Sequence, residues 1–391
     1  MADPVVIIGS GLAGYNVARE LRKLDAQVPL VLVSRDHAGF YSKPMLSNAL
    51  ASKKTPATLV MKAADKMAAE MNAQVLPHTA VEQIDTATRT LRLSNGDTLV
   101  YRDLVLALGA DPIRLPLQGQ AADKVLSVND LDDFARFADA LDAAERPVQK
   151  VLILGGGLIG CEFANDLLAR GIQPTVLDVA DRALARLLPA PSSAYLQARM
   201  EAAGAQFRFG AAAQAVDSAP SGQGLVVTLN DGTQLQADLV LSAIGLKPRT
   251  QLAEQAGLAV NRGVVVSQTL QTSAPHVYAV GDVAEVNGLH LPYVMPIMQQ
   301  ARALAATLAG TPTAVTYPAM PVVVKTPACP TVVCPPSPNA AGQWQVTEVE
   351  DGLEARFVSA DGQCLLGFAL HGKATSQRQA LAAQVPATLP A

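Results

Sequence analysis

Residues 5–14 read VVIIGSGLAG, an apolar run followed at once by three glycines in the spacing GxGxxG. The run carries no polar side chain, which is typical of a strand buried on both faces of a parallel sheet. A helical pattern follows over residues 15–24 and a second apolar run over residues 30–33. This order predicts a βαβ unit whose first turn is rich in glycine, as in dinucleotide-binding folds.

The same order returns at residues 151–160, which read VLILGGGLIG. A helical pattern over residues 161–170 and an apolar run over residues 174–177 complete a second predicted βαβ unit. A single GxGxxG string occurs in many loops. Two such strings, each between an apolar run and a helical pattern, indicate two dinucleotide sites in one chain.

Each glycine of such a turn has its own task. The first permits the tight turn, the second lets the backbone approach a pyrophosphate, and the third lets helix and strand pack closely. The N–H groups at the start of the helix then attract the phosphate charge. The residues expected to bind cofactor are Gly9, Gly11, Leu12, Ala13 and Gly14 in the first unit, and Gly155, Gly157, Leu158, Ile159 and Gly160 in the second.

The residue that closes the second strand of each unit differs. Asp178 lies eighteen residues after Gly160, where a carboxylate can bind a free ribose 2′-hydroxyl and would repel a 2′-phosphate. Asp178 therefore favours NADH, although Arg182 and Arg186 leave NADPH open. In the first unit Ser34 takes this position, and either Asp36 binds the ribose or Arg35 stacks on the adenine.

Composition narrows the class of protein. The chain has 391 residues, of which 50% are hydrophobic and 16% are charged, so two or three domains with large cores are expected. The formal net charge is −4, the basic residues are scattered and there is one Trp, a pattern that argues against nucleic-acid binding. The N-terminus shows neither a signal peptide nor a membrane-spanning run, so a cytoplasmic protein with no membrane partner is expected.

Longer strings resemble a known family. The segments LVLALGA before Asp111, SAIGLKPRT and VYAVGDVAE are similar to those of the FAD-dependent pyridine nucleotide–disulfide oxidoreductase superfamily. Within it, three strings resemble the NADH:rubredoxin reductases: YSKPMLSNAL (41–50), MPIMQQARALAATLAG (295–310) and PVVVKTPACPTVVCPP (321–336). The resemblance implies FAD and NADH as cofactors.

The same resemblance implies an α/β fold of two Rossmann-like domains, with the NAD domain inserted in the FAD domain, and a small C-terminal α+β domain. The expected bounds are 1–114 and 245–318 for the FAD domain, 115–244 for the NAD domain and 319–391 for the last domain. Val322–Val324 reads as a strand in a proline-rich segment, which suits an edge strand or loops. The tail from Gly342 alternates polar and apolar residues and ends in a short helical pattern near residues 374–383.

The resemblance also assigns roles near the flavin. Asp282 would bind the ribityl chain or the pyrophosphate side, unless it only caps the following segment. A helix beginning near Pro296 would point its N-terminus at the flavin N1–C2=O edge. Lys43 and Pro44 would lie along the isoalloxazine ring. The remaining residues expected near the cofactors are Val81, Ala107, Gly109, Gly245 and Gly281.

Two charged residues are expected at the flavin–nicotinamide junction. Glu162 follows the second glycine turn in the pattern GxGxxGxE, where it would meet the nicotinamide and pair with Lys43, unless it only serves the helix dipole. Relatives with a lysine at the end of the PxLSK pattern have it where this chain has Asn48, which weakens any one lysine–glutamate pairing. Lys325 is the one charge in a valine-rich run, and the resemblance suggests that it faces the flavin, unless it is only a solvated side chain.

The cysteines separate the related enzymes. Disulfide reductases have CxxxxC soon after the first βαβ unit, thioredoxin reductases have CxxC in the NAD domain, and peroxidases and oxidases have one N-terminal cysteine; this chain has none of these. Cys329 and Cys334 can form a redox pair, but unreactive thiols are favoured, and no spacing suggests a metal site.

Without a thiol relay, the electrons are expected to pass singly to rubredoxin, a small acidic iron protein. The alternatives are a ferredoxin, a flavorubredoxin, or a slow FAD- and NADH-binding redox sensor.

Overall fold

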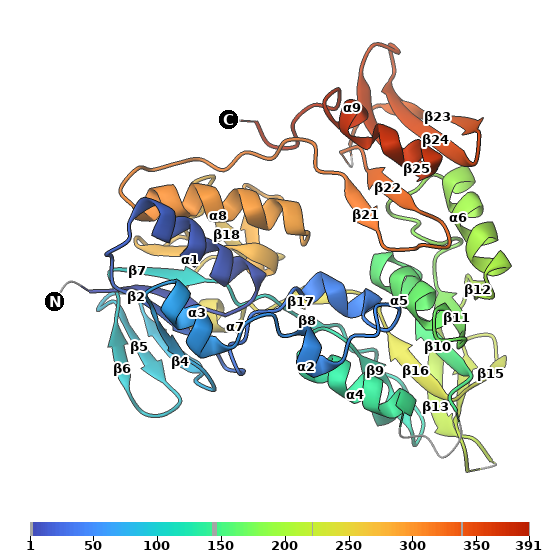
Figure 1. Ribbon diagram of the computed structural model, residues 1–391, viewed down its shortest axis with the longest axis horizontal. Coiled ribbons are helices and arrows are strands. Elements are labelled where there is room, and N and C mark those ends of the chain that lie inside the picture. Colours follow the sequence, from blue (N-terminus) through green and yellow to red (C-terminus); the bar gives the residue numbers. More distant parts are fainter. Residues whose placement is uncertain (1–2, 143–146, 221, 338, 391) are drawn as a thin grey trace.

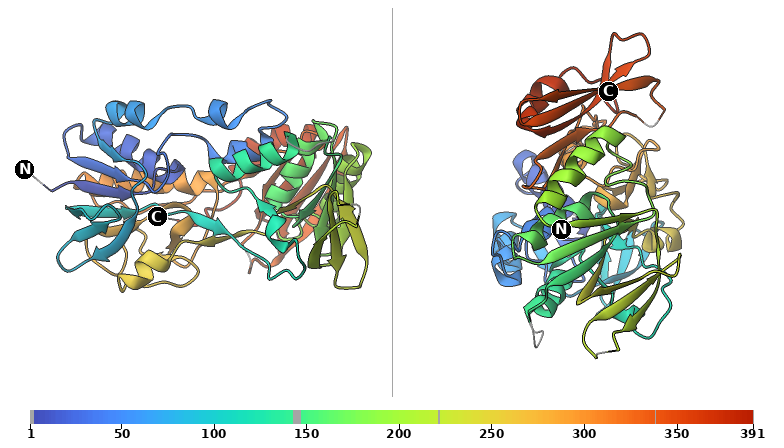
Figure 2. Two further views of the ribbon diagram at one scale, coloured as in Figure 1. Left: turned by 90° about the horizontal axis from the view of Figure 1, so that it is seen from below. Right: turned by 90° about the vertical axis from the view of Figure 1, so that its right-hand side faces the viewer.

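The computed structural model describes residues 3–142, 147–220, 222–337 and 339–390. Two α/β units lie at opposite ends of the molecule, and a third unit of antiparallel strands packs over the second (Figures 1 and 2). The chain builds most of the first unit, crosses to the second, returns to the first and then forms the third. Its last described residues run back to the first unit, where Leu389 pairs with Tyr317.

The first unit contains a five-stranded parallel sheet in the order β19-β7-β1-β2-β3. Its strands are short and mostly buried on both faces, as the apolar runs predict. They are β1 (Val5–Ile8), β2 (Leu30–Val33), β3 (Gln74–Leu76), β7 (Asp103–Leu106) and β19 (Val277–Ala279). Helix α1 (Leu12–Leu24) follows the glycine turn and packs against α8 (Val294–Leu308).

The second unit repeats this plan, with a parallel sheet in the order β12-β11-β10-β16-β9. The strands are β9 (Leu126–Ser127), β10 (Lys150–Leu154), β11 (Gln173–Asp178), β12 (Gln206–Phe209) and β16 (Leu239–Ser242). Its helices are α4 (Leu131–Asp142), α5 (Leu158–Leu168) and α6 (Ala190–Ala202). In both units the strand that precedes the glycine turn lies in the middle of the sheet.

Smaller elements complete these two units. Each has a three-stranded antiparallel sheet: β4 (Val81–Asp85), β5 (Thr90–Leu93) and β6 (Thr98–Val100) in the first, and β13 (Ala213–Ser218), β14 (Leu225–Leu229) and β15 (Gln234–Ala237) in the second. The first unit also has β18 (Val264–Val266) paired with β20 (Ala284–Val286), and the short helices α2 (Pro56–Leu59), α3 (Ala64–Glu70) and α7 (Gln251–Gln255). Their 3₁₀ turns are η1 (Lys43–Asn48), η2 (Ala122–Lys124) and η3 (Gly281–Val283), whereas η4 (Lys373–Gln377) belongs to the third unit.

Two antiparallel strands connect the units. β8 (Ala110–Pro112) leads out of the first unit and β17 (Leu246–Pro248) leads back, with Leu246 opposite Pro112 in the ladder. Arg249 holds the pair together, since its guanidinium donates to Asp111 Oδ1 at 2.7 Å and to the Leu108 carbonyl at 2.8 Å. The second unit is therefore inserted in the first.

The third unit is a five-stranded antiparallel sheet in the order β21-β22-β25-β24-β23. Its strands are β21 (Val322–Val324), β22 (Thr331–Cys334), β23 (Gly342–Val349), β24 (Gly352–Ser359) and β25 (Leu365–Gly372), and α9 (Arg378–Ala382) follows them. The sheet packs on α6 of the second unit through β24 and β25. β21 is an edge strand, as the prolines suggest, whereas β22 is an inner strand bounded by Pro330 and Pro335.

The predicted fold class is confirmed by this arrangement, and the expected domain bounds stay a prediction. Helices α1 and α5 each begin three residues earlier than predicted, because the end of the glycine turn already forms the first helical turn. Helix α8 begins at Val294, two residues before Pro296. Over the described ranges, no helix is long and apolar enough to cross a membrane.

Candidate active site between the two glycine turns

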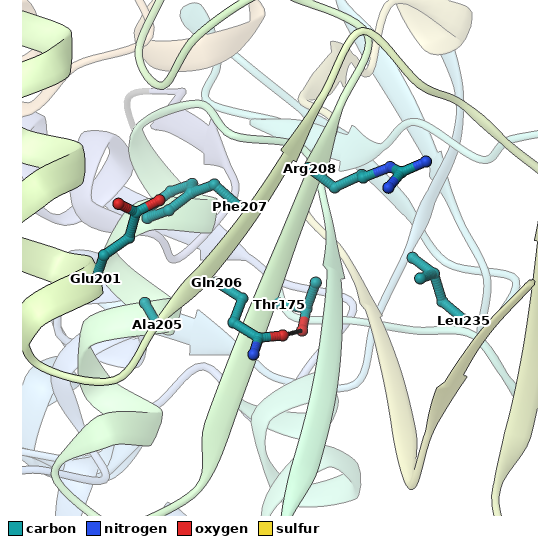
Figure 3. A pocket seen from close by; sticks show the side chains of 7 residues that line it. All are labelled: Thr175, Glu201, Ala205, Gln206, Phe207, Arg208 and Leu235. Atoms are coloured by element: carbon teal, nitrogen blue, oxygen red, sulfur yellow. Dashed lines mark hydrogen bonds between the residues drawn. The ribbon is translucent and has the colours of Figure 1, made fainter. Parts of the chain in front are cut away.

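One cavity of about 2570 Å³ runs from the first glycine turn to the second and on to the third unit. Its walls include Gly11, Gly157, Lys43 and Lys325, which come from all three units. A second hollow of about 380 Å³ lies at the outer edge of the second sheet, beside β12 (Figure 3). None of the expected site residues lines this second hollow, so the large cavity is the candidate site.

The two turns have nearly the same geometry. Gly9 and Gly155 have φ angles of +116° and +108°, which only glycine adopts readily. A Cβ on Gly14 would lie 1.9 Å from the carbonyl oxygen of Gly9, and one on Gly160 would lie 1.9 Å from that of Gly155. The third glycine of each motif therefore packs helix against strand, and neither Gly14 nor Gly160 lines the cavity.

The helix starts beside these turns carry unused donors. Gly11 and Gly157 are the N-caps of α1 and α5, and neither helix has a side-chain cap. A Cβ on either glycine would meet nothing within 4 Å, so both face open space in the cavity. Free helix N–H groups next to space for a backbone approach fit the pyrophosphate of a dinucleotide. The residues present thus fit two dinucleotide cofactors.

In the first unit, three polar side chains form a closed triangle after β2. Ser34 Oγ donates to Asp36 Oδ1 at 2.7 Å and lies 2.7 Å from Ser10 Oγ, which itself lies 3.2 Å from Asp36. Burial alone would raise the pKa of Asp36, yet the hydrogen bonds from Ser34 and from the Ala38 N–H hold it below its usual range. The Arg35 guanidinium lies 3.6 Å from the Asp111 carboxylate, and both residues line the cavity. Asp36 is thus the ionised group at the place where an acid usually binds ribose.

In the second unit, Asp178 ends β11 and holds its own glycine turn. Its Oδ2 accepts from the Gly156 N–H at 2.5 Å and its Oδ1 accepts from the Ala180 N–H at 2.8 Å. Asp178 also lines the cavity, and each of its oxygens can accept a further hydrogen bond. Arg186 lines the same region, whereas Arg182 forms an ion pair with Asp181 at 2.7 Å.

The end of β19 and the start of α8 meet the cavity together. Asp282 lines it, as do Val294 and Met295 at the start of α8, but Gly281 and Pro296 do not. Pro296 is buried inside the first turn of the helix, because that helix begins at Val294. The uncapped N-terminus of α8 still opens on the cavity, since its N-cap is Tyr293 without a side-chain hydrogen bond.

Gln300 holds the start of η3 against α8, a role that the sequence did not predict. Its Oε1 accepts from the Gly281 N–H at 2.6 Å, and its Nε2 donates to the Tyr317 hydroxyl at 2.8 Å. All three residues are buried or nearly so. Gln300 therefore ties α8 to the peptide that precedes Asp282. The sequence offers only one hint of this role, a polar side chain on the apolar face of a helix.

Glu162 is the centre of the junction between the units. It is 1% exposed, accepts from Ser47 Oγ at 2.6 Å and from the Lys325 N–H at 3.0 Å, and forms an ion pair with the Lys325 ammonium. The expected pair of Glu162 with Lys43 is wrong, because Lys325 of the third unit fills that place. The third unit thus contributes a charge to the site.

Lys43 lines the cavity at the start of η1 with a different environment. Burial lowers the pKa of its ammonium, while the nearby carboxylate of Asp282 raises it. Among the described residues, no hydrogen bond or ion pair reaches its ammonium. The side-chain nitrogen of Lys43 is therefore free to meet a bound cofactor, and Pro44 lies beside it on the cavity wall.

The other expected residues lie on the cavity wall as well. They come from both sheets and from the strands that connect the units: Gly9, Leu12, Ala13, Val81, Ala107, Gly109, Gly155, Leu158, Ile159 and Gly245. Four residues thus fall outside the lining, namely Gly14, Gly160, Gly281 and Pro296, and each packs directly behind it.

The cysteines stand apart from this chemistry. All four are free thiols. Cys329 lies 3.8 Å from His371, whereas Cys334 is at the far end of β22 opposite Phe368. Burial raises the pKa of Cys334 to about 11 and that of Cys161 to about 12. None of the four lines the cavity, and in the described ranges no group of three or more His, Cys, Asp or Glu is placed to hold a metal ion.

Comparisons with known proteins agree with this architecture. Residues 3–309 match the pyridine nucleotide-disulphide oxidoreductase family, and residues 314–385 match the rubredoxin-binding C-terminal domain. A rubredoxin-NAD(+) reductase of Alcanivorax borkumensis is 47% identical over 99% of this chain and 100% of its own length. One of Acinetobacter baylyi is 46% identical over 99% of each chain.

Two further relatives widen the picture. A nitric oxide reductase FlRd-NAD(+) reductase of Aeromonas salmonicida is 40% identical over 98% of this chain and 96% of its own length. A solved putidaredoxin reductase in covalent complex with putidaredoxin is 29% identical, with a TM-score of 0.86 over 98% of this chain and 94% of that one. Because the family match spans both glycine turns and the strands that connect them, the chain belongs to the pyridine nucleotide-disulphide oxidoreductase family, with a rubredoxin-binding domain at its C-terminus.

Proposed function

We propose that this chain is an NADH-dependent flavoprotein that transfers electrons from NADH, through bound FAD, to rubredoxin. One observation carries the proposal: a single cavity joins two glycine turns to the domain that matches rubredoxin-binding domains. Bound FAD would supply the conversion of a two-electron hydride donor into a source of single electrons. The full-length similarity to rubredoxin-NAD(+) reductases supports this direction of transfer.

The chain's own residues then bind and orient. The first turn, with Ser34 and Asp36, would hold FAD, and Asp282 would meet its ribityl or pyrophosphate portion. The second turn, with Asp178, would hold NADH. Transfer of a hydride requires alignment and electrostatics more than acid–base catalysis, and the cavity places both dinucleotides between the same walls.

Three positive groups would stabilise the charge that gathers on a reduced flavin. They are Lys43, Lys325 and the uncapped N-terminus of α8. Lys325 is held by Glu162, which would also fix the nicotinamide side of the junction. No cysteine lines the cavity, so the electrons would leave directly for the partner protein rather than through a dithiol.

The test is steady-state oxidation of NADH by the purified, FAD-loaded protein with rubredoxin as acceptor at low ionic strength. We expect turnover with rubredoxin to exceed that with a plant-type ferredoxin by at least about tenfold, or about 1.4 kcal/mol in the transition state. Equal rates with both carriers would overturn the assignment of rubredoxin. Flavin reduction slower than minutes in stopped flow, with a long-lived NADH complex, would favour a redox sensor instead.

A second acceptor is favoured by one observation. The relative of Aeromonas salmonicida that is 40% identical is a nitric oxide reductase FlRd-NAD(+) reductase. A flavorubredoxin acceptor would use the same third unit and the same cavity. Its turnover, measured beside that of rubredoxin at equal concentrations, separates the two candidates.

A cytoplasmic location is part of the proposal. Three of the four cysteines are buried thiols and the fourth, Cys364, is exposed and unpaired. A reducing compartment keeps such thiols free. Fractionation of cells with an antibody to the chain tests this location.

A further inference from the structure

Three polar side chains lie on one face of α5, directly behind the candidate site. Glu162, Asn165 and Asp166 are 1%, 7% and 1% exposed. Their spacing of three and four residues puts them side by side on the helix surface. Glu162 binds Ser47 and Lys325, as described above. The proposed function gives Asn165 and Asp166 no role, so it does not explain why these two polar side chains are buried here.

Asp166 holds the loop that follows Ser47. Its Oδ2 accepts from the Leu50 N–H at 3.0 Å and its Oδ1 accepts from the Ala51 N–H at 2.7 Å. This loop continues directly from η1, which carries both Lys43 and Ser47. The two hydrogen bonds therefore fix, against α5, the segment of the first unit that reaches the junction.

Asn165 holds the segment that follows Lys325. Its Oδ1 accepts from the Ala328 N–H at 2.9 Å. Residues 326–329 form a tight turn, in which the Cys329 N–H donates to the Thr326 carbonyl at 2.8 Å and Thr326 Oγ1 donates to the Cys329 carbonyl at 2.8 Å. Because this turn is closed by its own hydrogen bonds, a restraint at Ala328 also restrains Lys325.

Both partners of Glu162 are thus anchored a few residues farther along the chain by its neighbours on the same helix face. We propose that Asn165 and Asp166 are positioning residues that set the geometry of Glu162 with Ser47 and Lys325, and so the alignment of the flavin and nicotinamide sites. The inference rests on the proposed function for the meaning of that alignment. Helix α5 then joins the first and third units at one place.

A role in stability alone explains the burial of Asp166 less well than the positioning role does. The carboxylate is buried, and in the described part of the chain it forms no ion pair. Burial raises the pKa of its carboxyl, and the hydrogen bonds from Ala51 and Leu50 oppose that shift. The charges of Lys325 and Arg170 also oppose that shift, but the hydrogen-bond partners of the carboxyl are two backbone N–H groups, and burying a carboxyl group is a costly way to fill space. Its value lies in holding two N–H groups in fixed positions.

The experiment uses the FAD-loaded full chain with Asp166→Ala and, separately, Asn165→Ala. Amide hydrogen exchange reports the anchors directly: we expect exchange at Leu50 and Ala51 to quicken at least about tenfold in the first variant, and exchange at Ala328 in the second. Stopped-flow mixing with NADH reports the alignment. The rate of flavin reduction at saturating NADH should fall about tenfold to a hundredfold, with the dissociation constant of NADH unchanged within about twofold.

Glu285→Ala is the matched control. Glu285 is 3% exposed and also accepts two backbone N–H bonds, from Arg262 at 2.9 Å and Gly263 at 3.2 Å. Like Asp166 it does not line the cavity, but the segment it holds carries no partner of Glu162. We expect it to lower the unfolding midpoint as much as Asp166→Ala and to leave the rate of flavin reduction unchanged. Equal slowing by Glu285→Ala would overturn the inference, as would faster exchange at Leu50 and Ala51 with an unchanged reduction rate.

Milder variants keep the test usable if the alanine variants do not fold. Asp166→Asn keeps one acceptor and turns a donor toward the second N–H, so an intermediate loss of rate is expected. Asn165→Asp keeps the acceptor for Ala328 and should restore most of the rate lost in Asn165→Ala. No acceptor protein enters these measurements. Failure of the wild-type chain to be reduced by NADH would therefore reject the proposed function, whereas a variant without effect rejects only the positioning role.

Discussion

The two glycine turns have nearly the same geometry but differ in the carboxylate near the end of the next strand. In both, a Cβ on the third glycine would lie 1.9 Å from the carbonyl of the first, and in both the helix N-terminus is uncapped. After β2, Asp36 is satisfied by two serines and a local N–H. At the end of β11, Asp178 reaches back to its own turn at Gly156. Under the proposed function, the backbone would provide a phosphate site in each unit, and the carboxylate at the end of the next strand would decide which nucleotide suits it.

The largest expected effect comes from breaking each turn in the same way. Gly14→Ala and Gly160→Ala create equal clashes with a backbone oxygen, worth about 3 kcal/mol or more. We expect Gly14→Ala to lose FAD, seen as loss of visible flavin absorbance, with affinity down about a hundredfold or more. Gly160→Ala should keep its flavin and weaken NADH binding by a similar factor. Loss of flavin in both variants would show that the turns are not independent.

Asp178→Asn should have the next largest effect, confined to the second turn. The amide keeps one acceptor, so it would turn a donor toward the N–H of either Gly156 or Ala180, and it would lack the charge that disfavours a 2′-phosphate. Loss of a hydrogen bond to a charged group corresponds to about 1.5–3 kcal/mol, so KM for NADH should rise about tenfold to a hundredfold. The preference for NADH over NADPH should fall. The exposed Asp181 provides the control: Asp181→Asn should change neither quantity, and an equal effect there would assign the preference to general charge.

Ser34→Ala tests the first unit more gently. It removes two of the three hydrogen bonds of the triangle with Ser10 and Asp36, a loss of at least about 1 kcal/mol. We expect flavin to dissociate about fivefold more readily during dialysis, while KM for NADH stays the same. The distant, exposed Ser376→Ala serves as control. An increase in KM for NADH would contradict the separation of the two turns.

The smallest expected effect is on the free energy of unfolding at low pH. Because the pKa of Asp36 is held below its usual value, the stability it provides is fully present above the unfolded pKa of about 3.9 and is lost as the pH falls through the lower folded value. We expect the free energy of unfolding to fall less steeply below about pH 4 in Asp36→Asn than in the wild type. Denaturant titrations at several pH values measure the slope. Identical slopes would mean that Asp36 is not ionised against its neighbours in the folded chain.

Much of the fold could be predicted because its signals are local. A run such as Val5–Ile8 followed by a glycine turn predicts a strand, a turn and a helix from a few neighbouring residues. Cavity-lining residues near the turns, such as Gly11 and Asp178, follow from the same local pattern. The helix starts were placed late because Leu12 and Leu158 belong both to the motif and to the helix.

The contacts between units could not be predicted in this way. Glu162 and Lys325 are 163 residues apart, and no spacing along the chain says which lysine will meet a given carboxylate. Lys43 is close in the chain to an actual partner of Glu162, because it lies four residues before Ser47, which does bind Glu162. The buried amide of Gln300 was missed for a similar reason, since its partners at Gly281 and Tyr317 lie 19 and 17 residues away.

The paired strands β8 and β17 have a consequence for engineering. The chain leaves the first unit and re-enters it through neighbouring strands, with Ala110 opposite Pro248 and only about 5 Å between the two backbones. The second unit can therefore be treated as an exchangeable segment whose two ends lie in one pair of neighbouring strands. If the second unit is excised, a short linker can join β8 to β17. The corresponding unit of a relative that prefers another nucleotide can be inserted instead, with both splice points in this pair of strands.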